Sequence, residues 1–211
     1  LATVSLYAVW RANGYTVVFD ANGGEGEMAD QSASCGEPLD LAPNAFTRPG
    51  HAFGGWRTAA GVAYGDGETV VDLADGVDGA TVTLFATWEA NAYTVSFDAN
   101  GGAGAMSPQT MAYGAAAKLA ANRFTRAGYV FDGWKTGDGA AYADQSAVSN
   151  LTATAGANVT LYAGWTPRSF SVSFDSTGGS ACASASVVYG SAYGDTLPSP
   201  KRTGYVFAGW Y

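Results

Sequence analysis

Carboxylates next to amide side chains and glycines are the first candidates for chemistry, because calcium prefers oxygen ligands. Such a group occurs twice, as Asp20-Ala-Asn22-Gly-Gly and as Asp98-Ala-Asn100-Gly-Gly. A complete calcium loop needs several more oxygen ligands and a closing Glu at its twelfth position, and neither copy supplies that Glu. A third copy has Thr177 in place of the Asn. We therefore interpret these segments as hairpin turns and predict neither a metal site nor a cofactor.

A denser group of carboxylates, Asp72, Asp75 and Asp78, lies in a glycine-containing loop. Residues 14–90 contain twelve Asp and Glu against two Arg, whereas residues 91–167, which repeat their pattern, contain four acidic and four basic residues. Because the two copies do not share this acidity, a solvated face explains it better than a ligand site of the repeat. A cation site confined to this one loop is the alternative.

The chain has one histidine, His51, and two cysteines, Cys35 and Cys182, which excludes a zinc site rich in either residue. His51 takes the position that Tyr129 and Tyr205 have in later copies, so we interpret it as an aromatic strand residue rather than a general base. The cysteines lie almost two repeats apart, whereas a disulfide needs Cα atoms within about 7 Å. We predict unpaired cysteines, no catalytic residues and no enzymatic activity.

Aromatic side chains recur at one outward-facing strand position, as Tyr7, Phe85 and Tyr162. Two interpretations are open. Aromatic residues on a solvent-facing strand surface bind a glycan or a partner protein, or they pack under a neighbouring element of the fold. We favour the packing interpretation. Likewise, Cys35 stands where Tyr113 and Tyr189 stand, and we interpret it as a small apolar substitute for tyrosine.

The composition sets broader limits. Of 211 residues, 47% are hydrophobic and 13% are charged, which is typical of a globular protein. A net charge of −8 with only 10 Lys and Arg excludes a nucleic-acid binder. Apolar runs are too short for a transmembrane helix, and the first ten residues lack a signal-peptide pattern. Without an initiator Met, the sequence is expected to be an internal part of a longer protein, with its targeting and anchoring signals elsewhere.

Three blocks recur in a fixed order along the chain. The first block covers residues 15–24, 93–102 and 170–179. The second covers residues 46–56, 124–134 and 201–210, and the third covers residues 3–10, 81–88 and 158–165. The order predicts four parts: residues 1–13 as the closing strand of a preceding repeat, 14–90 and 91–167 as repeat units, and 168–211 as the first part of a further repeat.

Each repeat is predicted to consist mainly of strands. Tyr93, Val95 and Phe97 alternate with polar residues, which indicates a half-buried strand. In the third block, the residues predicted to face inward are Val159, Leu161, Ala163 and Trp165. The Ala-rich stretch Ala115–Asn122 favours a short helix, and Ser146–Thr154 is a second candidate. The predicted core residues are Phe19, Trp56, Trp88, Phe97, Trp134 and Trp165.

The motif order resembles that of the Listeria–Bacteroides repeat, also called the internalin-type B repeat. The motifs are Tyr93-Thr-Val-Ser-Phe-Asp-Ala-Asn-Gly-Gly, then Tyr113-Gly, then Arg126-Ala-Gly-Tyr-Val-Phe-Asp-Gly-Trp, then Val159-Thr-Leu-Tyr-Ala-Gly-Trp. The resemblance implies an α+β, strand-dominated fold of tandem β-grasp-like (ubiquitin-like) repeats, each with a mixed sheet and a short helix. It also implies an extracellular location on the bacterial cell surface, in secreted or wall-attached proteins, and no enzymatic activity.

These expectations define two candidate functions. Only about four residues join Trp88 to Tyr93, and such short joints favour a semi-rigid rod, so the leading hypothesis is a stalk or spacer. The alternative is an adhesin whose repeats bind a host protein or glycan. The expected partners are neighbouring repeats and, by strand addition between residues 1–13 and 168–211, further copies in head-to-tail association. No nucleic-acid partner and no membrane insertion of this segment are expected.

Overall fold

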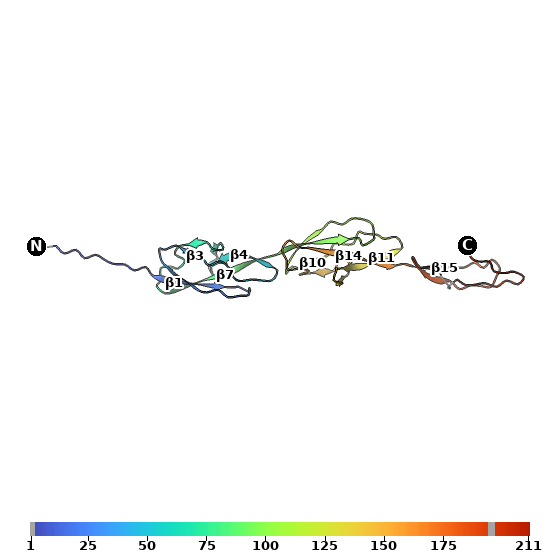
Figure 1. Ribbon diagram of the computed structural model, residues 1–211, viewed down its shortest axis with the longest axis horizontal. Coiled ribbons are helices and arrows are strands. Elements are labelled where there is room, and N and C mark those ends of the chain that lie inside the picture. The colour runs from blue at the N-terminus through green and yellow to red at the C-terminus, as the bar shows by residue number, and fades with distance from the viewer. Residues whose placement is uncertain (1–2, 194–196) are drawn as a thin grey trace. The chain divides into compact units, whose positions relative to one another are not determined.

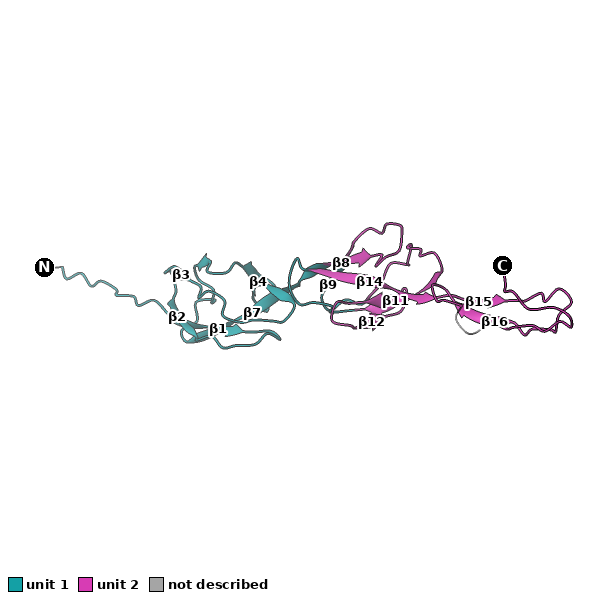
Figure 2. Cartoon of the chain, turned by 45° about the vertical axis from the view of Figure 1, so that its right-hand side comes forward, with its two compact units in different colours: residues 1–93, 111–116, 149–157 teal, residues 94–110, 117–148, 158–211 magenta. Residues whose placement is uncertain are grey.

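The computed structural model describes residues 3–193 and 197–211. Within these residues the chain forms sixteen strands and no helix (Figure 1). Two compact units are present: residues 1–93, 111–116 and 149–157 form the first, and residues 94–110, 117–148 and 158–211 form the second (Figure 2).

The first repeat is built on a five-stranded sheet with the order β2-β1-β7-β4-β5. Its strands are β1 (Gly14–Asp20), β2 (Gln31–Ser34), β4 (His51–Arg57), β5 (Ala63–Tyr64) and β7 (Ala80–Ala90). The central strand β7 runs parallel to β1 and antiparallel to β4, so the sheet is mixed. A small second sheet pairs β3 (Leu39–Asp40) with β6 (Thr69–Val70). The third sequence block thus supplies the strand on which the sheet is assembled.

The second repeat has the same sheet order, β9-β8-β14-β11-β12. Its strands are β8 (Ala92–Asp98), β9 (Gln109–Ala112), β11 (Tyr129–Lys135), β12 (Ala141–Tyr142) and β14 (Asn158–Pro167), and a small sheet pairs β10 (Ala117–Lys118) with β13 (Ala147–Val148). The register also corresponds, since Leu84 lies beside Phe19 and Leu161 beside Phe97. Beyond β14, a hairpin joins β15 (Ser169–Val172) to β16 (Ala185–Val188).

Alternation along the strands explains which side chains form the core. Tyr15, Val17 and Phe19 are buried on β1 while the residues between them are partly exposed, which confirms the predicted period of two. On β14, Leu161 and Ala163 are fully buried, as predicted for the third block. Burial on one face only is what a mixed sheet with one wet face requires.

A glycine bulge in β4 and in β11 turns a large aromatic residue inward. The pairing register shifts between Phe53 and Trp56, where Gly55 has a φ of 104°. A Cβ on Gly55 would lie 2.6 Å from the carbonyl oxygen of Tyr64, so a side chain does not fit there. The extra residue lets Phe53 and Trp56, three positions apart, both face the core.

The predicted core tryptophans differ in burial. Trp56 and Trp134 are fully buried, whereas Trp88 and Trp165 are only partly buried. The indole N–H of Trp88 donates a hydrogen bond of 2.9 Å to the carbonyl of Ala21, and Trp165 does the same to Ala99. These two residues therefore close the edge of the core with a polar contact rather than filling its centre.

The predicted α+β class and the short helix that was expected in each β-grasp-like repeat are wrong, because the residues described contain strands and no helix. Ala115–Asn122 contains β10 and loop, and Ser146–Thr154 contains β13 and loop. Helix propensity is a weak prior, and an eight-residue helix is marginal without packing. The extended conformation instead buries Leu119, whose N–H donates to Ser146 at 3.0 Å. The residues described include no helix that is long and apolar enough to cross a membrane.

Candidate functional site: the joint between repeats

The Asp-Ala-Asn-Gly-Gly segments are turns whose polar groups are already used. The carboxylate of Asp20 accepts a 2.7 Å hydrogen bond from the backbone N–H of Asn22, whose φ is 46°. The amide of Asn22 donates to the Ala86 carbonyl on β7 at 2.8 Å. Asp98 and Asn100 make the same contacts, with Ala163 on β14. The turn thus fastens the first block to the central strand.

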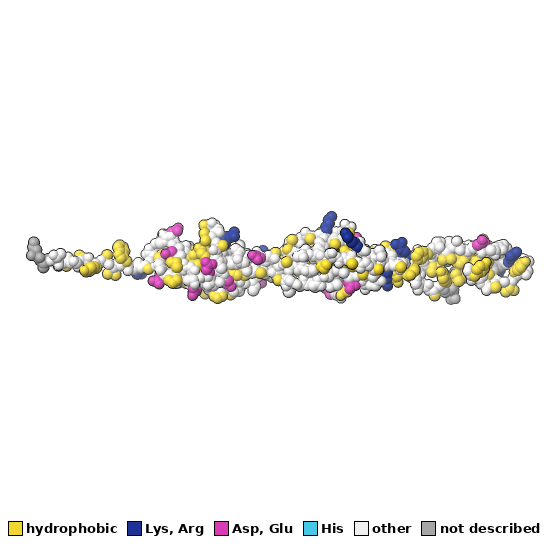
Figure 3. Space-filling view, turned by 90° about the horizontal axis from the view of Figure 1, so that it is seen from above, with side chains coloured by type: hydrophobic (Ala, Val, Ile, Leu, Met, Phe, Trp, Pro, Cys, Tyr) yellow, Lys and Arg dark blue, Asp and Glu magenta, His cyan; other side chains and the backbone are white. Residues whose placement is uncertain are grey.

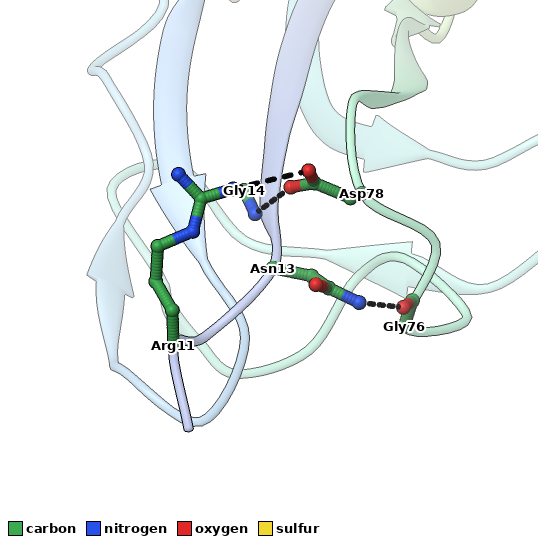
Figure 4. A network of polar contacts seen from close by, with 5 residues as sticks. All are labelled: Arg11, Asn13, Gly14, Gly76 and Asp78. Carbon is green, nitrogen blue, oxygen red and sulfur yellow. Dashed lines mark hydrogen bonds and ion pairs between the residues drawn. The ribbon is translucent and has the colours of Figure 1, made fainter. Parts of the chain in front are cut away.

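Acidic side chains gather over the first repeat (Figure 3). Two carboxylates of the Asp72–Asp78 loop, those of Asp72 and Asp78, accept hydrogen bonds from the backbone. Asp78 accepts from the Gly14 N–H at 2.9 Å and pairs with Arg11 at 3.2 Å (Figure 4). Asp72 accepts from the Gly36 N–H at 2.6 Å. No group of three or more His, Cys, Asp or Glu within residues 3–193 and 197–211 is placed to hold a metal ion.

One of these contacts recurs in the second repeat without a charge. Asn150 replaces Asp72 and accepts from the Gly114 N–H at 2.5 Å. Both residues have a positive φ, 53° for Asp72 and 55° for Asn150. The position therefore needs a residue that tolerates the left-handed backbone region and has a side-chain oxygen as acceptor. The carboxylate of Asp72 supplies that oxygen.

His51, considered above as a candidate base, lies in a contact between repeats. Its ring packs edge-on against Tyr113 with centroids 5.7 Å apart, and its Nδ1 lies 2.9 Å from the Pro49 carbonyl oxygen. Both cysteines are free and partly exposed. The histidine therefore has the role of an aromatic packing residue.

The contact around His51 is centred on the backbone of Asn91 and lies within the first compact unit. The Asn91 N–H donates to the Gly50 carbonyl at 2.8 Å, and its carbonyl accepts from the Tyr113 N–H at 2.9 Å. Its side-chain amide donates to the Ala153 carbonyl at 2.8 Å. Asn91 therefore joins the turn before β4 of one repeat to two loops of the next.

The contact requires a glycine at position 50, directly beneath the ring of Tyr113. Gly50 has a φ of 70°, and a Cβ built on it would lie 2.3 Å from the ring of Tyr113. The tyrosine ring thus lies directly on the glycine backbone, beside the ring of His51. We call this arrangement the joint. It consists of a glycine followed by an aromatic residue, and a tyrosine of the next repeat covers that aromatic residue.

A second joint of the same geometry lies within the second compact unit. The Arg168 N–H donates to the Gly128 carbonyl at 2.8 Å, and its carbonyl accepts from the Tyr189 N–H at 2.8 Å. The rings of Tyr129 and Tyr189 pack edge-on at 5.6 Å, and the Arg126 guanidinium lies 4.1 Å from the Tyr129 centroid. A Cβ on Gly128 would lie 2.3 Å from the Tyr189 ring.

The joint can hold two repeats together without a ligand. Each backbone hydrogen bond and the ring contact contribute about 1 kcal/mol. Sequence reasoning missed this site, although it noted His51 and Cys35 as departures at two tyrosine positions. The signal in the sequence was that the two departures fall at positions that contact each other. Position 51 contacts position 113, and position 113 of the second repeat corresponds to position 35 of the first.

The three aromatic residues at the outward-facing position of the third block have these exposures. Tyr7 is 88% exposed and Tyr162 is 38% exposed, whereas Phe85 is partly buried.

Comparison with known proteins gives matches over most of the chain. The Listeria-Bacteroides repeat domain matches three stretches, residues 15–87, 93–164 and 170–211. One relative, named "Putative Gly-rich membrane protein", from Evansella cellulosilytica, is 32% identical over 98% of this chain and 23% of its own length. Another, named "Putative membrane protein", from the same organism, is 34% identical over 99% of the chain and 29% of its own length. The chain thus spans about a quarter of the length of these relatives.

Proposed function

We propose, from the premise that this chain belongs to the Listeria-Bacteroides repeat family, that it is a non-catalytic spacer segment of a bacterial surface protein. The observation that carries the proposal is the recurrence of the joint at two consecutive positions with nearly equal geometry. A spacer needs neighbouring repeats to hold a fixed relation, and a repeated joint made of backbone hydrogen bonds and stacked rings supplies it.

The surface location rests on the relatives. Both are named membrane proteins, and this chain corresponds to a minor part of each. We infer that the repeats lie outside the cell, next to other parts that provide the anchor. Within the repeats, His51, the turn carboxylates, Asp72 and Asp78 have structural partners, which supports a role without catalysis.

Direct adhesion to a host protein or glycan is the competing function. Repeated recognition needs a patch of similar chemistry on each repeat. Charge differs between residues 14–90 and 91–167, so the chain favours the spacer.

Spin labels on the two native cysteines test the spacer directly. Cys35 belongs to the first compact unit and Cys182 to the second, and both are partly exposed. We expect pulsed electron resonance to give one narrow distance distribution in the native chain. A broad distribution, as from a flexible linker, would contradict the spacer, and saturable binding of a glycan or host protein would favour adhesion.

A further inference from the structure

Two asparagines that fasten the turns of the repeats are followed directly by glycine. They are Asn22, before Gly23, and Asn100, before Gly101. Both lie in the exposed turns that follow β1 and β8. Asparagine loses its side-chain amide most readily before glycine, because glycine has no Cβ to keep its backbone nitrogen away from the neighbouring side chain. These two positions are therefore candidates for a spontaneous covalent modification.

The reaction needs only water and the chain itself. The backbone nitrogen of Gly23 loses its proton and attacks Cγ of Asn22, and the Cγ–Nδ2 bond breaks, so that the amide leaves as ammonia. Water then opens the resulting succinimide ring to aspartate or to isoaspartate, and no electrons are transferred. The attacking nitrogen is available, since the N–H of Gly23 makes no hydrogen bond with the residues described, and the same is true of Gly101.

In the folded turn, the amide that must leave is held by the central strand. Nδ2 of Asn22 donates to the Ala86 carbonyl on β7 at 2.8 Å, and Nδ2 of Asn100 donates to the Ala163 carbonyl on β14 at 2.9 Å. The backbone N–H of each asparagine also donates, at 2.7 Å, to the aspartate two residues earlier. Loss of ammonia breaks the bond to the central strand, so the reaction requires the turn to release from that strand.

The product cannot restore the bond that is lost. Aspartate at position 22 has no side-chain N–H to donate, and its carboxylate would face the Ala86 carbonyl oxygen, where two acceptors are left without a shared hydrogen. Isoaspartate adds a methylene group to the backbone of a tight turn, in which φ is 46° at Asn22 and 81° at Gly23. Neither product fastens the first block to β7 again.

We propose that Asn22 and Asn100 are deamidation sites controlled by the attachment of their turns to the central strand. A fastened turn retains the amide, each release exposes it to attack, and the reaction makes the release permanent. The modification therefore records that a repeat has opened at the end of its first block. The inference goes beyond the spacer function, which requires only the joints.

Peptide mapping by mass spectrometry, after incubation of the 211-residue chain at mildly alkaline pH, tests the proposal. We expect Asn22 and Asn100 to deamidate at least about tenfold more slowly in the native chain than in the chain unfolded by guanidinium chloride. The reason is that the native rate equals the rate of the open chain multiplied by the open fraction. Equal rates in the folded and unfolded chain, or no reaction at either residue in the unfolded chain, would overturn the proposal.

Asp20→Ala loosens one turn and leaves the other as an internal reference. It removes the acceptor of the Asn22 N–H, so Asn22 should deamidate about tenfold faster, while Asn100 in the same molecule keeps its native rate. Asp78→Ala is the matched control. It removes a carboxylate that accepts from the Gly14 N–H at the opposite end of β1, and it should leave both rates unchanged.

An unchanged rate at Asn22 in Asp20→Ala, or equal acceleration in both variants, would contradict control by the turn. The modified chain gives a second readout. In the intact turn the Gly24 N–H donates to the Ala21 carbonyl at 2.9 Å, and in chains modified at Asn22 this amide should exchange about tenfold faster. Unchanged protection of the Gly24 amide would show that the turn closes again after the reaction, against the proposal.

Discussion

Trp134→Ala is expected to lower the free energy of unfolding of the second repeat by about 3–5 kcal/mol, the range for emptying a buried aromatic site. The Trp134 ring is fully buried and contacts the rings of Phe97, Phe124 and Phe131 at centroid distances of 4.9–6.0 Å. Its indole N–H makes no hydrogen bond with the residues described, so the loss is one of packing. Urea unfolding followed by circular dichroism measures the change.

The matched control for this substitution is Trp10→Ala at a dilute chain concentration. Trp10 is 90% exposed, so its removal should change the unfolding free energy by less than about 0.5 kcal/mol. A loss below about 1 kcal/mol for Trp134→Ala would show that the indole is not the centre of the core.

Gly128→Ala should open the second joint. The substitution strains a residue with a φ of 78° and places a Cβ 2.3 Å from the Tyr189 ring, so the ring must leave. Opening exposes the chain after Arg168, where trypsin cleaves. We expect the cleavage rate at Arg168, mapped by mass spectrometry, to rise about tenfold or more, because proteolysis follows the population of the open form.

Gly114→Ala separates backbone strain from the displacement of a tyrosine ring, the two effects that Gly128→Ala combines. Gly114 also has a φ of 78°, but nothing described lies within 4 Å of a Cβ built there. Backbone strain of about 1–2 kcal/mol is therefore common to both variants, and only Gly128→Ala displaces a tyrosine. Equal cleavage at Arg168 in the two variants would contradict the joint.

The strands were predictable because their side chains alternate with a period of two. Phe19 and Leu161 face inward, as the pattern required. The segment Ala115–Asn122 was not predictable in the same way, since local Ala content favours a helix while the burial of Leu119 and the pairing of β10 with β13 are decided by distant residues.

The joint was hidden for a similar reason. Tyr113 is far from Gly50 and His51 in sequence, and each of the three taken alone has an ordinary explanation, as a hairpin end, a turn and a strand residue respectively. Only the pairing of β4 with β7, which brings Asn91 beside Gly50, makes them neighbours. The role of the Asp72 carboxylate likewise became clear only through Asn150, which accepts the same hydrogen bond without a charge.

The central claim is that consecutive repeats are held together by these joints, and amide hydrogen exchange of the native chain tests it most directly. The N–H groups concerned are those of Asn91, Tyr113, Arg168 and Tyr189. We predict that they are protected to a degree comparable with the amides of β1 and β8, because each donates a hydrogen bond of 2.8–2.9 Å. Exchange of these four amides at the rate of an unstructured linker, with β1 and β8 still protected, would contradict the account.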